Sequence, residues 1–145
     1  MNTKVVKNNP DAIIPTKAHT TDVGYDLTAI SIYKKISDNT ILFDTGIAVT
    51  PPTGYYIEIV PRSSINKFGY MLSNSVGIID PDYTGNLLIS LTKVDQKMPN
   101  LEPPFKICQL IIRKLEPNIN FIEYDSLNQT VRGDGGFGSS DCIEK

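Results

Sequence analysis

Short apolar segments separated by turn residues recur along the whole chain. Residues 25–30 and 55–60 alternate apolar and polar positions, and residues 105–113 form the longest stretch of this kind. A period of two turns one side-chain face toward a core and the other toward solvent, which is typical of β-strands. The pattern therefore predicts many strands and almost no helix. The expected strands are residues 4–7, 25–30, 41–43, 47–49, 55–60, 77–79, 87–91, 105–113 and 119–124.

Residues 77–91 read as an apolar strand, a tight polar turn and a second apolar strand. Pro81 fixes one turn dihedral, and Gly85 relieves the backbone where the second strand begins. This order predicts a β-hairpin that holds Asp80 and Tyr83 at fixed offsets near its bend. A carboxylate beside apolar residues can act as a general base, because partial desolvation raises its proton affinity. An ordinary surface turn is the alternative interpretation of the same residues.

A short helix is expected over residues 63–68, directly after Arg62. Serine favours the cap position of a helix, and Gly69 can end it. Two hydroxyls from Ser63 and Ser64, free backbone amides and a neighbouring guanidinium together suit a phosphate group. A capped surface helix with a solvated arginine would have the same sequence.

The last part of the chain is rich in glycine between Arg132 and Ser140. Such a composition excludes a stable helix or a core strand. A disordered end is one interpretation, and a flexible arm that orders over a ligand is the other. We therefore expect a β-barrel domain over residues 1–130 and a C-terminal arm over residues 131–145.

The number of strands indicates an all-β fold, a distorted jelly roll or barrel with one short helix. The 145 residues correspond to one domain, and a net charge of −2 makes stable nucleic-acid binding unexpected. No apolar run approaches the roughly 20 residues that span a bilayer, and the first residues have no signal-peptide core. Cys108 and Cys142 form neither a disulfide framework nor a metal-site spacing. A soluble protein of the cell interior, in cytoplasm or nucleus (or in a host cell, for a virus), is expected.

Five segments, taken in order, resemble the trimeric deoxyuridine triphosphate nucleotidohydrolase (dUTPase) family. The resemblance covers nearly the whole chain, and its third and fifth segments are the most specific. The segments are Gly24–Leu27, Pro61–Ser64, Asn74–Leu87, Ile107–Ile111 and Arg132–Ser140.

The resemblance implies a homotrimer of jelly-roll subunits that hydrolyses dUTP to dUMP and pyrophosphate with Mg²⁺. This reaction limits uracil in DNA and supplies dUMP for thymidylate synthesis. Three active sites would lie at subunit interfaces, each closed by the C-terminal arm of a further subunit. Asp26 would help to hold the hydrated Mg²⁺, which is otherwise bound by phosphates.

The resemblance also assigns roles along the substrate. Asp80 would be the base that activates water for attack on the α-phosphorus. Tyr83 would pack below the deoxyribose and leave no room for a 2′-hydroxyl. The uracil edge would be read by Asn74 and by the backbone around Gly77 and Ile79.

Phosphate contacts are implied for a larger set, with Phe137 stacking on the uracil. The barrel would contribute Arg62, Ser63, Ser64 and Gln109. The arm would contribute Arg132, Gly138, Ser139 and Ser140.

Several positions depart from the family pattern without removing a group assigned to the chemistry. Ser64 stands where many members have glycine, and Lys106 replaces a frequent arginine. The related dCTP deaminases carry a catalytic glutamate at the position that matches Ser90, and a serine cannot shuttle that proton. A dCTP deaminase-like enzyme and a non-catalytic jelly-roll binding or regulatory module are therefore the alternatives.

Overall fold

The computed structural model of the chain describes residues 1–141, and most of its ordered elements are short antiparallel strands. Every predicted strand except residues 119–124 is present, and the pattern did not predict β3 or β7. The elements are β1 (Lys4–Lys7), β2 (Tyr25–Ala29), β3 (Ser31–Lys35), β4 (Thr40–Asp44), β5 (Ile47–Thr50), β6 (Tyr55–Pro61), η1 (Ser63–Lys67), β7 (Tyr70–Leu72), β8 (Gly77–Ile79), β9 (Leu88–Lys93), β10 (Phe105–Lys114) and η2 (Ser139–Asp141), the two η elements being 3₁₀ helices.

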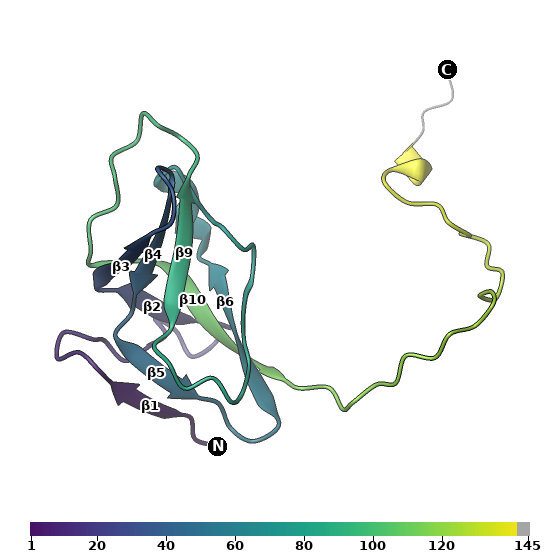
Figure 1. Cartoon of the computed structure of the whole chain (residues 1–145), viewed down its shortest axis with the longest axis horizontal. Helices are drawn as coiled ribbons and strands as arrows, with labels where there is room; N and C mark the ends of the chain where they lie inside the picture. The colour runs from purple at the N-terminus through teal and green to yellow at the C-terminus, as the bar shows by residue number, and fades with distance from the viewer. Residues whose placement is uncertain (142–145) are drawn as a thin grey trace.

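Two four-stranded sheets form the body of the molecule (Figure 1). One has the strand order β2-β10-β6-β8, and the other has the order β3-β4-β9-β7. Strands β1 and β5 pair separately as a two-stranded sheet. All the pairings are antiparallel, which confirms the predicted all-β fold of the jelly-roll type.

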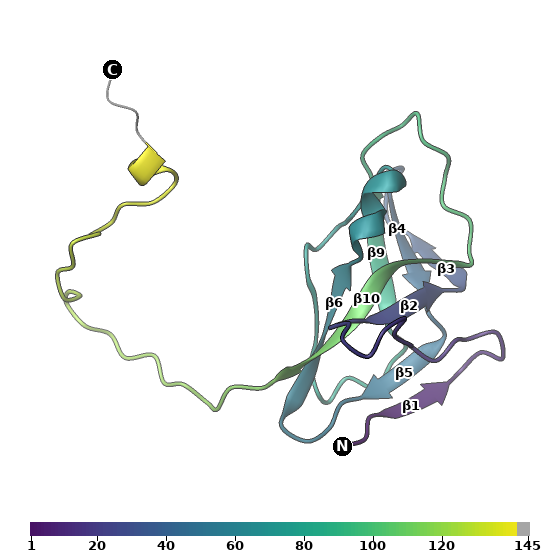
Figure 2. The same ribbon diagram turned by 180° about the vertical axis from the view of Figure 1, so that it is seen from behind.

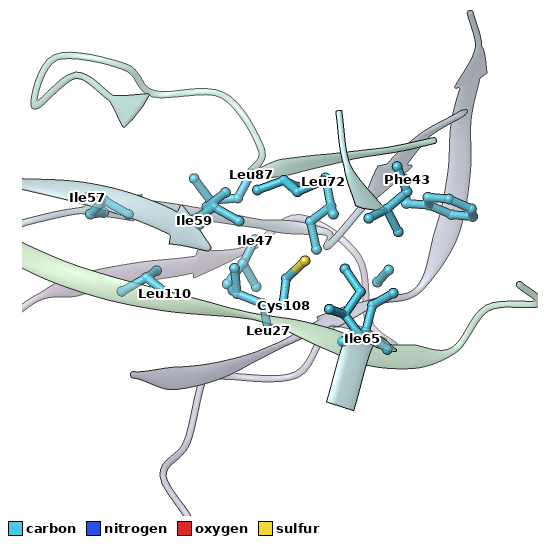
Figure 3. Close-up of a cluster of buried hydrophobic side chains, with 14 of the residues drawn as sticks. Leu27, Phe43, Ile47, Ile57, Ile59, Ile65, Leu72, Leu87, Cys108 and Leu110 are labelled. Carbon is cyan, nitrogen blue, oxygen red and sulfur yellow. The ribbon is translucent and has the colours of Figure 1, made fainter. Parts of the chain in front are cut away.

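The core lies between the two large sheets, where alternate residues of facing strands meet (Figure 3). Ile57 and Ile59 of β6 are buried, and Phe43 of β4 packs edge-on against Phe105 at 4.8 Å between ring centroids. Fully burying a side chain of this size stabilises the fold by about 1.5–3 kcal/mol. Burial raises the pKa of the Cys108 thiol to about 12, so the neutral thiol packs as a small apolar group. Cys142 lies outside the described residues.

The predicted hairpin over residues 77–91 is wrong in one respect. Strand β8 pairs with β6, whereas β9 pairs with β4 and β7 in the opposite sheet. The tight turn itself is present, because the amide of Tyr83 donates to the carbonyl of Asp80 at 3.1 Å. Two short apolar strands can bury their apolar faces either as neighbours in one sheet or as members of two facing sheets. The local sequence pattern does not distinguish the two arrangements.

The strand predicted at residues 119–124 is also wrong. The chain leaves the barrel at the end of β10 and runs away from it without pairing (Figure 1). Ile119, Phe121 and Ile122 are at least 70% exposed, so their apolar side chains have no core to join in the single chain. Within residues 1–141, no helix is long and apolar enough to cross a membrane.

The element η1 and the point where the chain leaves the barrel after β10 lie at opposite ends of the barrel (Figure 2). Strands β6 and β10 connect these two ends, with Cys108 opposite Pro61 and Lys114 opposite Tyr55. The antiparallel pairing therefore places the segment after β6, which begins with Arg62, at one end of the barrel and the segment after β10 at the other end.

Candidate active site

One pocket of about 220 Å³ collects residues from three of the resembling segments. Asp26 comes from β2, Arg62 and Ser63 follow β6, and Gln109 lies on β10. These residues meet because β10 pairs with both neighbours, and Gln109 stands opposite Asp26 on one side and Val60 on the other. The central strand thus brings together side chains that are more than 80 residues apart in the sequence.

Asp26 is the electrostatic centre of this pocket. Its Oδ1 atom lies 3.0 Å from Arg62 Nε, and its Oδ2 atom lies 3.4 Å from Lys106 Nζ. Arg62 also donates from Nη1 to the carbonyl of Lys106 at 2.9 Å. The Asp26 side chain is only 19% exposed, so the pair is screened less than a surface ion pair. The arrangement holds the guanidinium in place while most of its five donors stay available.

Lys106 departs from the family pattern, and the sequence does not predict it as a site residue. Its contact with Asp26 shows that a lysine here supplies the second positive charge beside the pocket. The pocket lining also includes Asp22, which the sequence placed in an ordinary polar loop. Neither residue stands in a motif with a distinct spacing, so periodicity could not have found them.

Gln109 closes the floor of the pocket against Gly24. Its Nε2 atom donates to the carbonyl of Pro61 at 3.0 Å. Gly24 is buried beneath the amide, and an added Cβ there would lie 2.7 Å from Gln109 Cδ. Only glycine leaves room for the amide in this orientation.

The short helix at residues 63–67 differs from its prediction. Arg62, not a serine, is its N-terminal cap residue, and no side chain makes a capping hydrogen bond. A 3₁₀ helix of five residues aligns only a few peptide dipoles, so its N-terminus attracts an anion weakly. The attraction for an anion at this end comes from the guanidinium of Arg62. Ser63 is exposed and lines the pocket, whereas Ser64 is half-buried and is not part of the lining.

The residues predicted to contact the base and the sugar lie elsewhere. Asn74 is exposed, Gly77 and Ile79 pair with β6, and Asp80 and Tyr83 follow β8. Ile79 stands opposite Ile57, which places Asp80 near Tyr56 at the start of β6.

Asp80 and Arg62 therefore lie at opposite ends of one strand. From Tyr56 to Arg62 the chain advances six residues, which corresponds to about 20 Å along a β-strand. Asp80 is exposed in the single chain, so the partial desolvation assumed for it is not provided within one subunit. The structure does not bring the predicted base to the predicted phosphate pocket.

The arm residues form a third group, away from both others (Figure 1). Phe137 is fully exposed and has a φ of 51°, a value that is uncommon for residues other than glycine. Arg132 donates from Nε to the carbonyl of Gly135 at 2.9 Å. Ser139 and Ser140 lie in η2, which the sequence did not predict, and Gly138 precedes it with a φ of 81°.

The chemistry of these parts indicates the kind of ligand that they can bind. The pocket around Arg62 combines a guanidinium, a serine hydroxyl, an amide and the carboxylate of Asp26, which suits a phosphate-bearing ligand. Within residues 1–141, no three His, Cys, Asp or Glu side chains gather closely enough to hold a metal.

Comparison with known proteins identifies the family. The dUTPase family profile matches residues 10–141. The deoxyuridine 5′-triphosphate nucleotidohydrolase of Finegoldia magna is 38% identical over 144 residues, which cover 95% of this chain and 97% of that protein. The enzyme of the same name from Escherichia phage T5 is 39% identical over 120 residues, covering 83% and 78% of the two chains. The chain belongs to the dUTPase family.

Solved structures agree on the fold. A D95E variant of the dUTPase from Staphylococcus phage 80alpha has a TM-score of 0.76 at 23% identity, with 96% of this chain and 98% of that chain covered. The D95N variant of the phage phi11 enzyme, in a structure described as revealing the coordination of a structural Mg(II) ion, has a TM-score of 0.69 at 20% identity. It covers 86% of this chain and 99% of that chain.

Replacing Gly24 by alanine should displace the Gln109 amide from the pocket. We expect Gly24→Ala to weaken the binding of inorganic triphosphate by about tenfold, because one anchored donor leaves the site. Gln109→Ala should weaken binding to the same extent, and the double variant should lose no more than either single variant. Titration calorimetry on the four proteins checks this. Additive losses would show that Gly24 does not act through Gln109.

Proposed function

We propose that this chain hydrolyses dUTP to dUMP and pyrophosphate in a site that two subunits build and a third closes. The observation that carries the proposal is the distance between the two halves of the site along β6. Arg62 and Asp80 are held about 20 Å apart by the strand that connects them. A base must lie within hydrogen-bond reach of the attacking water, so the Asp80 that serves one phosphate pocket belongs to another copy.

The phosphate half of the site is supported by its donors. Arg62 keeps free N–H groups beyond those used for Asp26 and Lys106, and Ser63 adds an exposed hydroxyl. Ser64 and Gln109 extend this set in the proposal, with Gln109 held by Pro61. Donors fixed before the ligand arrives stabilise developing negative charge without reorganisation.

Asp26 fits a role beside a phosphate-bound Mg²⁺. Magnesium keeps several waters and needs only one or two protein carboxylates when phosphates supply the other ligands. The two oxygens of Asp26 have more lone pairs than their contacts to Arg62 and Lys106 occupy, so they can also accept from metal-bound water. When bound, the ion would neutralise charge on the triphosphate.

The chemical step is assigned to Asp80. Its carboxylate orients a water and accepts a proton as the water oxygen bonds to the α-phosphorus. The bond from the α-phosphorus to the bridging oxygen of the β-phosphate then breaks, and pyrophosphate leaves. Tyr83 packs below the deoxyribose, and Asn74 with the backbone at Gly77 and Ile79 contacts the uracil edge.

The trimer is supported by apolar side chains that one chain leaves in water. Exposed large hydrophobic residues follow one another beyond β10, and an isolated chain gains nothing by exposing them. They are Leu115, Ile119, Phe121, Ile122, Tyr124, Leu127 and Val131. A segment of this kind, running away from its own barrel, suits packing against a second copy.

The arm over residues 131–145 completes the proposed site. Phe137 would stack on the uracil, and phosphate contacts would come from Arg132, Gly138, Ser139 and Ser140. The turn at Phe137 presents its ring outward, which suits a contact with another subunit.

Replacing Asp80 by asparagine should lower kcat for dUTP by at least about a hundredfold, because the amide cannot accept the proton. Affinity for a non-hydrolysable dUTP analogue should change little. Asp82→Asn is the matched control, since Asp82 is an exposed carboxylate in the same turn and should leave kcat near the wild-type value. Pyrophosphate release and calorimetry provide the two measurements. Normal turnover in Asp80→Asn would remove Asp80 as the base.

Deleting residues 131–145 should lower kcat by about a hundredfold, because water and misaligned phosphates then enter the site. The melting temperature should stay close to that of the full chain, since Arg132 and Ser139 make hydrogen bonds within the arm. Phe137→Ala is a control that keeps the arm length and should lose part of the activity. A truncated protein with full activity would contradict the closing role of the arm.

A further inference from the structure

A hydrogen-bonded cluster secures the end of the loop that carries the predicted base. Asn86 Nδ2 donates to both carboxylate oxygens of Asp44, at 3.1 and 3.2 Å. Asn86 Oδ1 accepts from Asn8 Nδ2 at 2.7 Å, and Asp44 Oδ1 also accepts from the amide of Gly46 at 2.7 Å. Both side chains of the Asp44–Asn86 pair are half-buried, so their contacts are partly shielded from competing water.

The backbone behind this pair is buried and paired as well. Leu87 donates to the carbonyl of Ile47 at 2.8 Å. The carbonyl of Leu87 accepts from the amide of Thr45 at 3.2 Å and from its hydroxyl at 2.8 Å. Leu87 and Thr45 are at most 1% exposed. Residues 86 and 87 are therefore attached to the β4–β5 turn on both side-chain and main-chain atoms.

Tyr83 depends on this attachment for its orientation. Its Oη atom donates to the carbonyl of Asn86 at 2.7 Å. The phenol folds back over Gly85, where an added Cβ would lie 2.6 Å from the hydroxyl oxygen and 2.8 Å from Cζ. The residue is still 41% exposed, so part of its surface is available to a ligand. A shift of the Asn86 carbonyl would move the hydroxyl that fixes the ring.

We propose that Asp44 and Asn86 are positioning residues that set the selectivity for deoxyribose over ribose through Tyr83. The inference rests on the proposed function, in which Tyr83 lies below the sugar. Selectivity against a 2′-hydroxyl by exclusion requires a ring that cannot yield. The pair and its partners Asn8 and Gly46 are not among the residues that line the pocket around Arg62.

Exchange of the two side chains provides a test by rescue. Asp44→Asn turns an amide toward the Asn86 amide, so two donors face each other. Asn86→Asp brings two carboxylates together, which repel. In the double variant Asp44→Asn/Asn86→Asp, the amide at position 44 donates to the carboxylate at position 86. The amide of Gly46 and Nδ2 of Asn8 can still donate to a side-chain oxygen at positions 44 and 86, respectively.

The measurement is the ratio of kcat/KM for dUTP to kcat/KM for UTP, with Mg²⁺ present. Each single variant should lower this ratio about tenfold, mainly through a higher KM for dUTP and better use of UTP. The double variant should recover most of the wild-type ratio. Tyr83→Phe, which removes only the hydroxyl, should lower the ratio as the single variants do.

Thr40→Val is the matched control. Thr40 lies at the other end of β4 from Asp44, and its hydroxyl is hydrogen-bonded to the hydroxyl of Thr92 on β9 at 2.8 Å. The substitution removes this hydrogen bond between β4 and β9. It should lower the melting temperature and leave the ratio unchanged. The proposal is overturned if the ratio stays within twofold of wild type in the single variants, or if the double variant does not recover. If no Asp44 variant folds, an unchanged ratio in Tyr83→Phe overturns it. A wild-type protein without preference for dUTP contradicts the proposed function itself.

Discussion

The antiparallel pairing of β6 with β10 and β8 is the constraint on which the rest of the structure depends. One edge of β6 aligns β10, so that Gln109 and Asp26 meet Arg62 at one end of the barrel. The other edge aligns β8, so that Asp80 follows at the opposite end. A paired strand cannot shorten, and no rotamer covers about 20 Å. Oligomer formation is therefore part of the proposed catalytic apparatus and not only a means of stability.

Within each half of the proposed site, polar groups are held by neighbouring residues of the same chain. Asp26 and the Lys106 carbonyl fix the guanidinium of Arg62, and Gly24 leaves the space that Gln109 occupies. In the other half, Asn86 fixes the hydroxyl of Tyr83. These side chains are therefore ordered when the barrel folds, so that ligand binding and turnover require little further loss of conformational entropy.

Much of the fold could be predicted from the sequence, because alternation of apolar residues and turn signals act locally. The strands over residues 55–61 and 105–114 and the turn at Pro81 are of this kind. The sheet partner of β8 could not be predicted, since either sheet buries an equally apolar face. The segment 119–124 has the composition of a strand, but a strand needs a partner that one chain does not supply. Arg62, Ser63 and Gln109, which line one pocket, were named as site residues through the resemblance, whereas the ion pair of Lys106 with Asp26 required the three-dimensional register.

The most direct test of a site shared between subunits is complementation between two inactive variants. Asp80→Asn and Arg62→Ala chains are each purified and assayed for dUTP hydrolysis, then unfolded together and refolded as mixed oligomers. If Asp80 and Arg62 of different copies form one site, about one quarter of the sites in an equal mixture contain both intact residues. The mixture then recovers a corresponding share of wild-type activity. Mixed oligomers that stay as inactive as the two separate variants would show that both residues must lie in the same chain.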